Sequence, residues 1–326
     1  MRKQFVYTVL VGFLCASGFA QGVEDFGEPQ FAPLKSSCNS VRCNDVLTEN
    51  ILVAGVNAAG PRAIKQRAGV CASASSTLID VAPSRRDGQD FREVPIWQLQ
   101  DSRIFFFVSG MMIDADGAPN AYSPDDKGLD ELANAGTPDH WNGIITDRDG
   151  NPLIQQGRDP FPGYYISCTS LADDDKEFTD PTAYVDASTI PYVTLPSDIA
   201  DRGGARLGDF AVVMNLRNRK SSFAIYADSG TLGEGSVALA DALGIRSDAR
   251  SGGQSEGILY LLFPGSGNLQ PRTIGEIESE GEKLRLRHSS RIKELFSCGE
   301  LEDTVGVEES LGNATNVVDW NVATVR

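Results

Sequence analysis

Residues 210–244 read FAVVMNLRNRKSSFAIYADSGTLGEGSVALADALG. Two short runs within this stretch, 210–216 and 222–227, are rich in apolar, β-branched and aromatic residues, which is typical of β-strands. Apolar residues then recur at intervals of three at Val237, Ala240 and Leu243, which predicts a short helix from about Gly235 to Leu243, ended by Gly244. The stretch therefore predicts a β domain that carries one inserted helix.

Short apolar runs of the same kind recur from residue 104 onward, separated by Gly, Pro, Asn and Asp. They span residues 104–113, 143–146, 152–155, 163–168, 191–195, 210–216, 222–227 and 257–263. Many short strands with few helices predict a barrel or a sandwich, so the expected fold class is mainly β. A C-terminal helix is predicted over residues 274–296, where Glu and Lys or Arg recur at helical spacing.

The first 20 residues have the pattern of an export signal. Arg2 and Lys3 precede an apolar run over residues 5–15, and small residues lead up to Ala20. We expect cleavage after Ala20, a secreted or periplasmic protein, and no stable membrane insertion after cleavage. An uncleaved anchor is the alternative, but the apolar run is shorter than the roughly 20 residues that span a bilayer.

These patterns divide the chain into four parts. Residues 1–20 form the signal peptide, and residues 21–100, which mix Pro, Gly, Ser and charged residues, form an N-terminal extension. Residues 101–267 form the β domain, and residues 268–326 form a helical and acidic C-terminal extension. The whole chain is 41% hydrophobic, which is ample material for a packed core.

The chain is strongly acidic. Its formal net charge is −16, and this becomes −18 when residues 1–20 are removed, because they carry Arg2 and Lys3 and no acid. Such a charge argues against nucleic acid as a partner, since phosphate binding needs basic stripes. It would attract a cationic substrate, although acidity can also serve solubility alone.

Cysteine and histidine give little support for a metal or a cofactor. Five cysteines remain after signal removal, an odd number that leaves at least one thiol free or intermolecular. Cys38 and Cys43 are close enough in sequence to close a small loop in an oxidising compartment. His140 and His288 lie at no ligand spacing from two cysteines, so we expect no metal site and no cofactor.

Carboxylates are the default acid–base residues in a chain with two histidines and none of the usual serine hydrolase, zinc protease or phosphate-loop motifs. Three acidic clusters compete for the role. Residues 173–175 are interpreted as a solvated loop. Asp114 and Asp116 follow an apolar strand, where they stand either at the mouth of a barrel or in a capped β-turn. Asp228 and Glu234 flank a glycine-containing loop between a strand and the predicted helix.

The third cluster is the most informative. Glu234 stands between Gly233 and Gly235, and glycines let a ligand approach the backbone closely. The alternative is that Glu234 only stabilises the start of the helix, whose dipole favours negative charge there.

Five short segments follow one another along the β domain: MIDADG (112–117), IPYV (190–193), FAVVMN (210–215), FAIYAD (223–228) and GEGSVALA (233–240). They occur in the order found in glycoside hydrolase family 75, the fungal-type chitosanases and their bacterial relatives, and the chain resembles that family over about residues 105–267.

The resemblance implies a double-psi β-barrel as the catalytic domain and an inverting hydrolase. The family's catalytic Asp, in a Gly-Asp-Thr-Asn motif, corresponds to Asp228, and its catalytic Glu, in a Gly-Glu-Ala-Ser motif, corresponds to Glu234. Asp114 and Asp116 fall at an acidic motif and are predicted to bind a cationic sugar, with Tyr226 as a further substrate contact. This chain departs from the family in having Ser229-Gly230 after the Asp and Gly235 after the Glu.

The predicted function is therefore endo-acting hydrolysis of chitosan-like polymers of β-1,4-linked amino sugars by a secreted monomer. In the hypothesis, Glu234 protonates the glycosidic oxygen while ionised Asp228 activates a water. An inverting mechanism needs the two carboxyl groups about 6.5–9.5 Å apart, whereas about 5 Å would indicate a covalent route. The alternatives are a non-catalytic carbohydrate-binding or cell-envelope protein on the same barrel, and a structural protein in which the two acids only cap a loop and a helix.

Overall fold

The computed structural model describes residues 75–86, 90–138 and 140–296. The predicted signal peptide, the Cys38–Cys43 loop and the acidic tail after residue 296 lie outside these residues.

The described part of the chain is mainly β. Its strands are β1 (Ser75–Arg86), β2 (Asp90–Leu99), β3 (Phe105–Asp114), β4 (Gly136–Thr137), β5 (His140–Trp141), β6 (Tyr192–Leu195), β7 (Phe210–Asn215), β8 (Ser221–Ser229), β9 (Glu234–Ser236) and β10 (Gln254–Phe263). Its helices are α2 (Ser197–Gly203), α3 (Val237–Ala242), α4 (Ile274–Arg287) and α5 (Ser289–Phe296), with 3-10 turns at Leu132–Ala135 and Pro181–Ala183.

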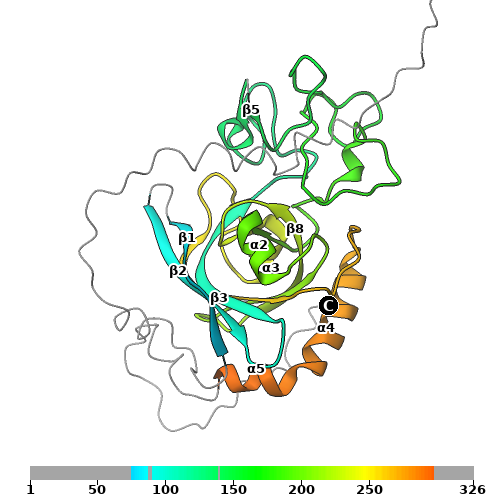
Figure 1. The fold of residues 1–326 in the computed structure, drawn as a ribbon. Helices are drawn as coiled ribbons and strands as arrows, with labels where there is room; N and C mark the ends of the chain where they lie inside the picture. Colours follow the sequence, from blue (N-terminus) through cyan, green and yellow to red (C-terminus); the bar gives the residue numbers. More distant parts are fainter. Residues whose placement is uncertain (1–74, 87–89, 139, 297–326) are drawn as a thin grey trace, which may run out of the picture. The chain divides into compact units, whose positions relative to one another are not determined.

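The main sheet closes into a barrel (Figure 1). Around the barrel the strand order is β3-β10-β7-β8-β6-β9, and β9 pairs back onto β3. The β6–β8 and β3–β9 pairs are parallel, and the remaining pairs are antiparallel. The predicted mainly β barrel is confirmed. Strands β1 and β2 add to the sheet beside β3, within the range that the sequence assigned to an N-terminal extension.

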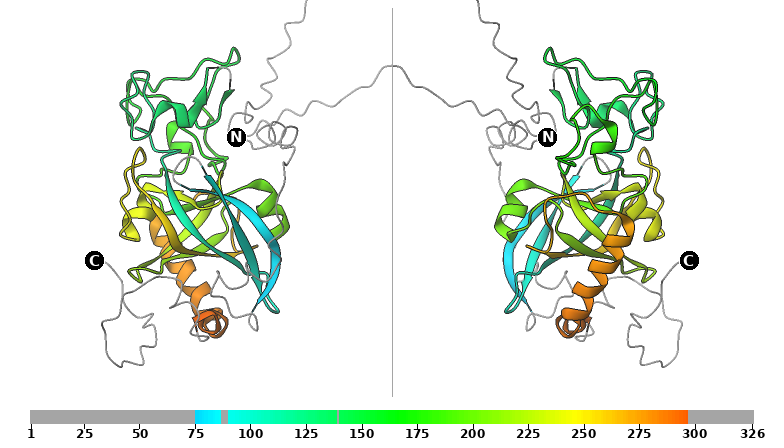
Figure 2. Two further views of the ribbon diagram at one scale, coloured as in Figure 1. Left: turned by 90° about the vertical axis from the view of Figure 1, so that its left-hand side faces the viewer. Right: turned by 90° about the vertical axis from the view of Figure 1, so that its right-hand side faces the viewer.

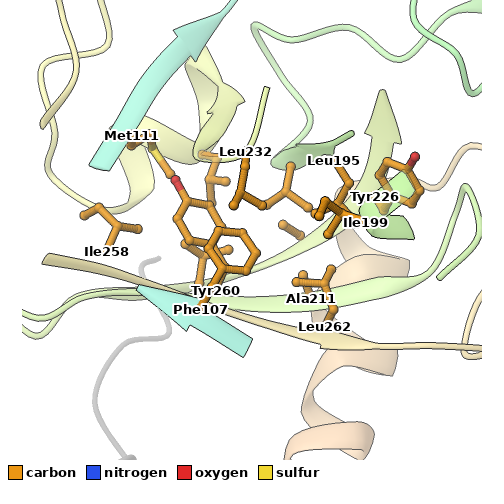
Figure 3. Packing of buried hydrophobic residues seen from close by; sticks show 14 of the residues in the cluster. Phe107, Met111, Leu195, Ile199, Ala211, Tyr226, Leu232, Ile258, Tyr260 and Leu262 are labelled. Atoms are coloured by element: carbon orange, nitrogen blue, oxygen red, sulfur yellow. The ribbon is translucent and has the colours of Figure 1, made fainter. Parts of the chain in front are cut away.

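Alternating side chains of the strands fill the barrel. Phe107 of β3 stacks on Tyr260 of β10 with ring centroids 4.7 Å apart, and Leu195 and Tyr226 lie in the same buried cluster (Figure 3). Burial of a large apolar side chain contributes about 1.5–3 kcal/mol to folding. The alternate positions, such as Tyr192, point out of the barrel and pack in a second buried cluster with residues of the 115–190 segment.

The 115–190 segment contains little regular structure. The predicted strands at 143–146, 152–155 and 163–168 form only isolated bridges, such as Ile144 with Ser167 and Ile154 with Tyr165. Scattered backbone hydrogen bonds cross-link the segment, such as that from the Ile145 N–H to the Ile166 carbonyl at 2.9 Å. Buried Gln155 adds to them, because its Nε2 donates to the carbonyls of Pro119 (2.5 Å) and Tyr165 (3.0 Å). We call residues 115–190 the loop segment.

The helices differ from the prediction in detail. Helix α3 is confirmed, and the predicted helix at 274–296 is two helices that meet at His288. Helix α2 was missed because its buried residues, Ile199 and Ala200, are adjacent and form no helical repeat; the helix ends at Gly204, which is in the left-handed conformation. Helix α4 packs along the outside of the barrel (Figure 2), where Gly281 allows Phe223 of β8 to lie against its backbone. Within the described residues, no helix combines the length and the hydropathy needed to cross a membrane.

Candidate active site

A β-bulge in β8 places Asp228 on the outer face of the barrel. Val193 of β6 pairs with Tyr226 and the next residue, Thr194, pairs with Asp228, so Ala227 is an extra residue in β8. A bulge of this kind turns the following side chain to the other face. Tyr226 therefore points into the barrel, while Ala227 packs with the loop segment and Asp228 contacts it.

The Asp228 carboxyl is almost buried, with 8% of the residue exposed. Its Oδ1 accepts three hydrogen bonds, from the Ser170 hydroxyl (2.6 Å), the Ser170 N–H (2.8 Å) and the Ser229 N–H (2.8 Å). The loop segment is fixed to the strand at this point, because the Leu171 N–H donates to the Ala227 carbonyl at 2.8 Å.

Glu234 is the first residue of β9, which lies between β3 and β6. Its side chain is half-buried and its Oε2 accepts the Thr231 N–H at 2.7 Å. The same oxygen lies 3.2 Å from the Thr194 hydroxyl. Gly230 packs closely against it, since a Cβ at that position would stand 2.7 Å from Oε2.

Thr194 links the two predicted catalytic acids. It pairs with Asp228 on one side of β6, and its hydroxyl contacts Glu234 on the other side. Neighbouring strands lie about 4.8 Å apart, so the backbones that carry the two acids are about 10 Å apart across β6. The structure thus brings Asp228 and Glu234 to the same part of the barrel wall.

The other two predicted site acids lie beside this pair. Asp114 is the last residue of β3 and pairs with Ser236 of β9, two residues along from Glu234. Its Oδ1 accepts the Asp116 N–H at 2.9 Å, which is the turn geometry predicted as one alternative. The Asp116 carboxyl accepts the Tyr122 hydroxyl at 2.5 Å, and both Asp114 and Asp116 keep part of their surface exposed.

The three aspartates perturb one another. Burial, followed by the charge of Asp114, raises the pKa of Asp228 to about 8. Burial also raises the pKa of Asp114, to about 6. The pKa of Asp116 is raised well above its ordinary value by burial and then by the charges of Asp114 and Asp228. Carboxyl groups that crowd in this way cannot all ionise at neutral pH, so the cluster retains protons.

Tyr226, predicted as a substrate contact, lies in the barrel core with 4% of its surface exposed (Figure 3). Burial raises the pKa of its hydroxyl to about 12. The ring offers no open face on which a sugar can stack. The bulge after Tyr226 separates its inward direction from the outward direction of Asp228.

Two residues of the site were missed by sequence reasoning. Ser170 lies 58 residues before Asp228, and Thr194 lies 40 residues before Glu234. Ser170 stands next to no recognisable motif. Thr194 directly follows the IPYV segment. The acidic run at 173–175 is partly to fully exposed, as predicted for a solvated loop. No group of three or more His, Cys, Asp or Glu side chains in the described ranges is arranged to hold a metal ion.

Residues 111–284 match the sequence model of a protein family described as fungal chitosanase of glycosyl hydrolase group 75. The matched range begins within β3 and ends within α4, so it contains all four acids described above. No curated protein matches the chain.

Proposed function

Because this chain belongs to the fungal chitosanase family of glycosyl hydrolase group 75, and is thus a glycoside hydrolase of the chitosanase type, we propose that Asp228 and Glu234 carry out its hydrolysis. The substrate in this proposal is a chitosan-like polymer of β-1,4-linked amino sugars, cleaved at internal bonds.

The observation that carries the proposal is the position of the two acids on either side of Thr194. A backbone separation of about 10 Å leaves room for carboxyl groups at the roughly 6.5–9.5 Å that an inverting mechanism needs, with a water between them. The proposed route is direct displacement by water, which the resemblance to the family implies and for which this separation leaves room.

The surroundings of the two acids favour Asp228 as the proton donor, which reverses the roles in the sequence-based hypothesis. With a pKa of about 8, Asp228 keeps its proton at neutral pH and can deliver it to the glycosidic oxygen. Glu234 is more exposed and accepts the Thr231 N–H, which suits a carboxylate that activates a water. A raised pKa of a buried carboxyl serves the same purpose in other glycosidases.

The preference for a cationic polymer is supported by Asp114, which keeps part of its surface exposed beside the catalytic pair, and by the net charge of −18 after signal removal. Export is supported by the basic and apolar start of the chain and by Cys168, which is disulfide-bonded, because disulfides persist in oxidising compartments. We propose that the mature enzyme acts outside the cytoplasm as a monomer and without a cofactor.

The test replaces each acid by its amide. Asp228→Asn and Glu234→Gln should each lower chitosan hydrolysis by about 10³-fold or more, while neither variant is much less stable than the unaltered protein. Exposed Asp175→Asn and Glu278→Gln serve as matched controls and should keep full activity. Full activity in either active-site variant would remove that residue from the mechanism.

Substrate and stereochemistry are tested on the unaltered protein. We expect it to shorten chitosan faster than chitin or peptidoglycan and to release products of inverted anomeric configuration, followed by NMR during the first minutes of reaction. Retained configuration would exclude the water-mediated mechanism. Binding of the polymer without new reducing ends would instead indicate a carbohydrate-binding protein that has lost turnover.

A further inference from the structure

We propose that Ser170 is a positioning residue that holds the Asp228 carboxyl in the orientation from which it donates its proton. This inference rests on the proposed role of Asp228 and adds a residue of the loop segment to the catalytic arrangement.

The contact is made twice by one residue. The Ser170 hydroxyl and N–H both donate to Asp228 Oδ1, at 2.6 Å and 2.8 Å. The Ser229 N–H approaches the same hydroxyl at 3.1 Å, so the serine also touches the backbone that follows the acid. Backbone pairing of Leu171 with Ala227 keeps Ser170 in register with Asp228. The serine is therefore built into the acid's surroundings and is not a chance neighbour.

Three donors on Oδ1 decide where the acid carries its proton. A protonated carboxyl has one oxygen that bears hydrogen and one that accepts, and an oxygen that already accepts three hydrogen bonds is the accepting one. The proton of Asp228 then stays on Oδ2. Removal of the Ser170 hydroxyl takes away the shortest of the three bonds and lets the carboxyl turn about its Cβ–Cγ bond.

The charges around Asp228 and the hydrogen bonds from Ser170 shift the pKa of Asp228 in opposite directions. The hydrogen bonds from Ser170 stabilise the ionised form and lower the pKa of Asp228, whereas the charge of Asp114 raises it. The other titratable groups that interact with this carboxyl are Asp116, Tyr192 and Tyr226, and Glu234 lies beyond Thr194. Loss of the Ser170 hydroxyl and loss of the Asp114 charge must therefore shift the protonation of Asp228 in opposite senses.

The experiment compares the pH dependence of kcat/KM on short glucosamine oligomers for five forms of the full chain. These are the unaltered enzyme, Ser170→Ala, Ser170→Thr, Asp114→Asn and Ser188→Ala, in which Ser188 is an exposed serine of the same loop segment. The substrate titrates identically in every assay, so differences between variants report on the enzyme.

We expect Ser170→Ala to lower kcat about tenfold and to move the alkaline limb of the profile to higher pH by about one unit. A shift of about one unit is the pKa change expected when a carboxyl group loses one charge-assisted hydrogen bond. Asp114→Asn should move that limb down, and Ser170→Thr, which keeps the hydroxyl, should restore the original limb. Ser188→Ala should match the unaltered enzyme.

A limb that stays in place in Ser170→Ala, with or without lower kcat, would overturn the inference, because a purely structural role changes activity without changing protonation. If Ser170→Ala is too inactive to assay, the pH dependence of its melting temperature gives the same answer, since the titration of Asp228 must still move upward. Failure of the proposed function has a different signature: Asp228→Asn would remain active, whatever Ser170→Ala does.

Discussion

The barrel and the loop segment hold their residues in different ways. In the barrel, backbone pairing sets positions: β6 lies between β8 and β9, and that order alone places Thr194 between Asp228 and Glu234. In the loop segment, isolated bridges, scattered backbone hydrogen bonds and side chains such as Gln155 take the place of a continuous ladder. The barrel thus supplies the two acids, and the loop segment supplies Ser170, which controls one of them.

The difference implies that the two regions have unequal stability. A barrel opens only when many backbone bonds and packed side chains are lost together, whereas a loop held by a few side chains opens locally. Mutations in the barrel should accordingly disturb the placement of the two acids. Mutations in the loop segment should disturb the hydrogen bonds that Ser170 donates to Asp228.

The largest effect is expected from Phe107→Ala. The Phe107 ring is fully buried and stacked on Tyr260, and removal of a buried phenylalanine costs about 3–5 kcal/mol of unfolding free energy. Because the barrel carries the site, activity should be lost over the same denaturant range as the fold. Chemical denaturation followed by tyrosine and tryptophan fluorescence measures the cost, and Phe107→Leu should lose clearly less. A cost under about 1 kcal/mol would mean that the barrel core is not the main source of stability.

A smaller and more local effect is expected from Gln155→Leu. This change leaves the carbonyls of Pro119 and Tyr165 and the Phe161 N–H without their partner, at about 1–3 kcal/mol in total. Hydrogen exchange should accelerate in residues 115–190 while β7 and β10 stay protected. Exposed Gln156→Leu is the matched control. Equal acceleration in the barrel strands would show that the two regions open as one unit.

The effect of Asp228→Asn on stability depends on pH. The pKa of Asp228 is about 8 in the folded protein and near 3.8 for a free side chain, so folding favours the protonated form. The stability contributed by the protonated form is fully present below about pH 3.8 and is lost progressively as the pH rises to about 8. Asp228→Asn cannot ionise, so its stability relative to the unaltered protein should rise by several kcal/mol between about pH 5 and pH 9 and should level off above about pH 8. Asp175→Asn should show no such trend, and a constant difference across this range would contradict the shift.

Local patterns predicted much of the barrel. Short runs of apolar, β-branched and aromatic residues located β3, β6, β7, β8 and β10, and apolar residues at intervals of three located α3. Strand β9 was missed because its three residues, of which one is glycine, carry no periodic signal and pair only because β3 and β6 lie on either side. Strands β1 and β2 were missed because their sequences mix charged, Pro and Ser residues, and β2 is held by its pairing with β3.

By itself the sequence determined that the chain is acidic, that its centre folds into short strands, and that Asp228 and Glu234 are candidates for a catalytic pair. Only the tertiary structure decided that Ala227 is a bulge, that Tyr226 turns inward, and that Ser170 meets Asp228 across 58 residues. Local propensity reflects contacts within a few residues, whereas desolvation and hydrogen bonding of a carboxyl depend on which distant segments surround it. For that reason the acids were visible in the sequence while their protonation was not.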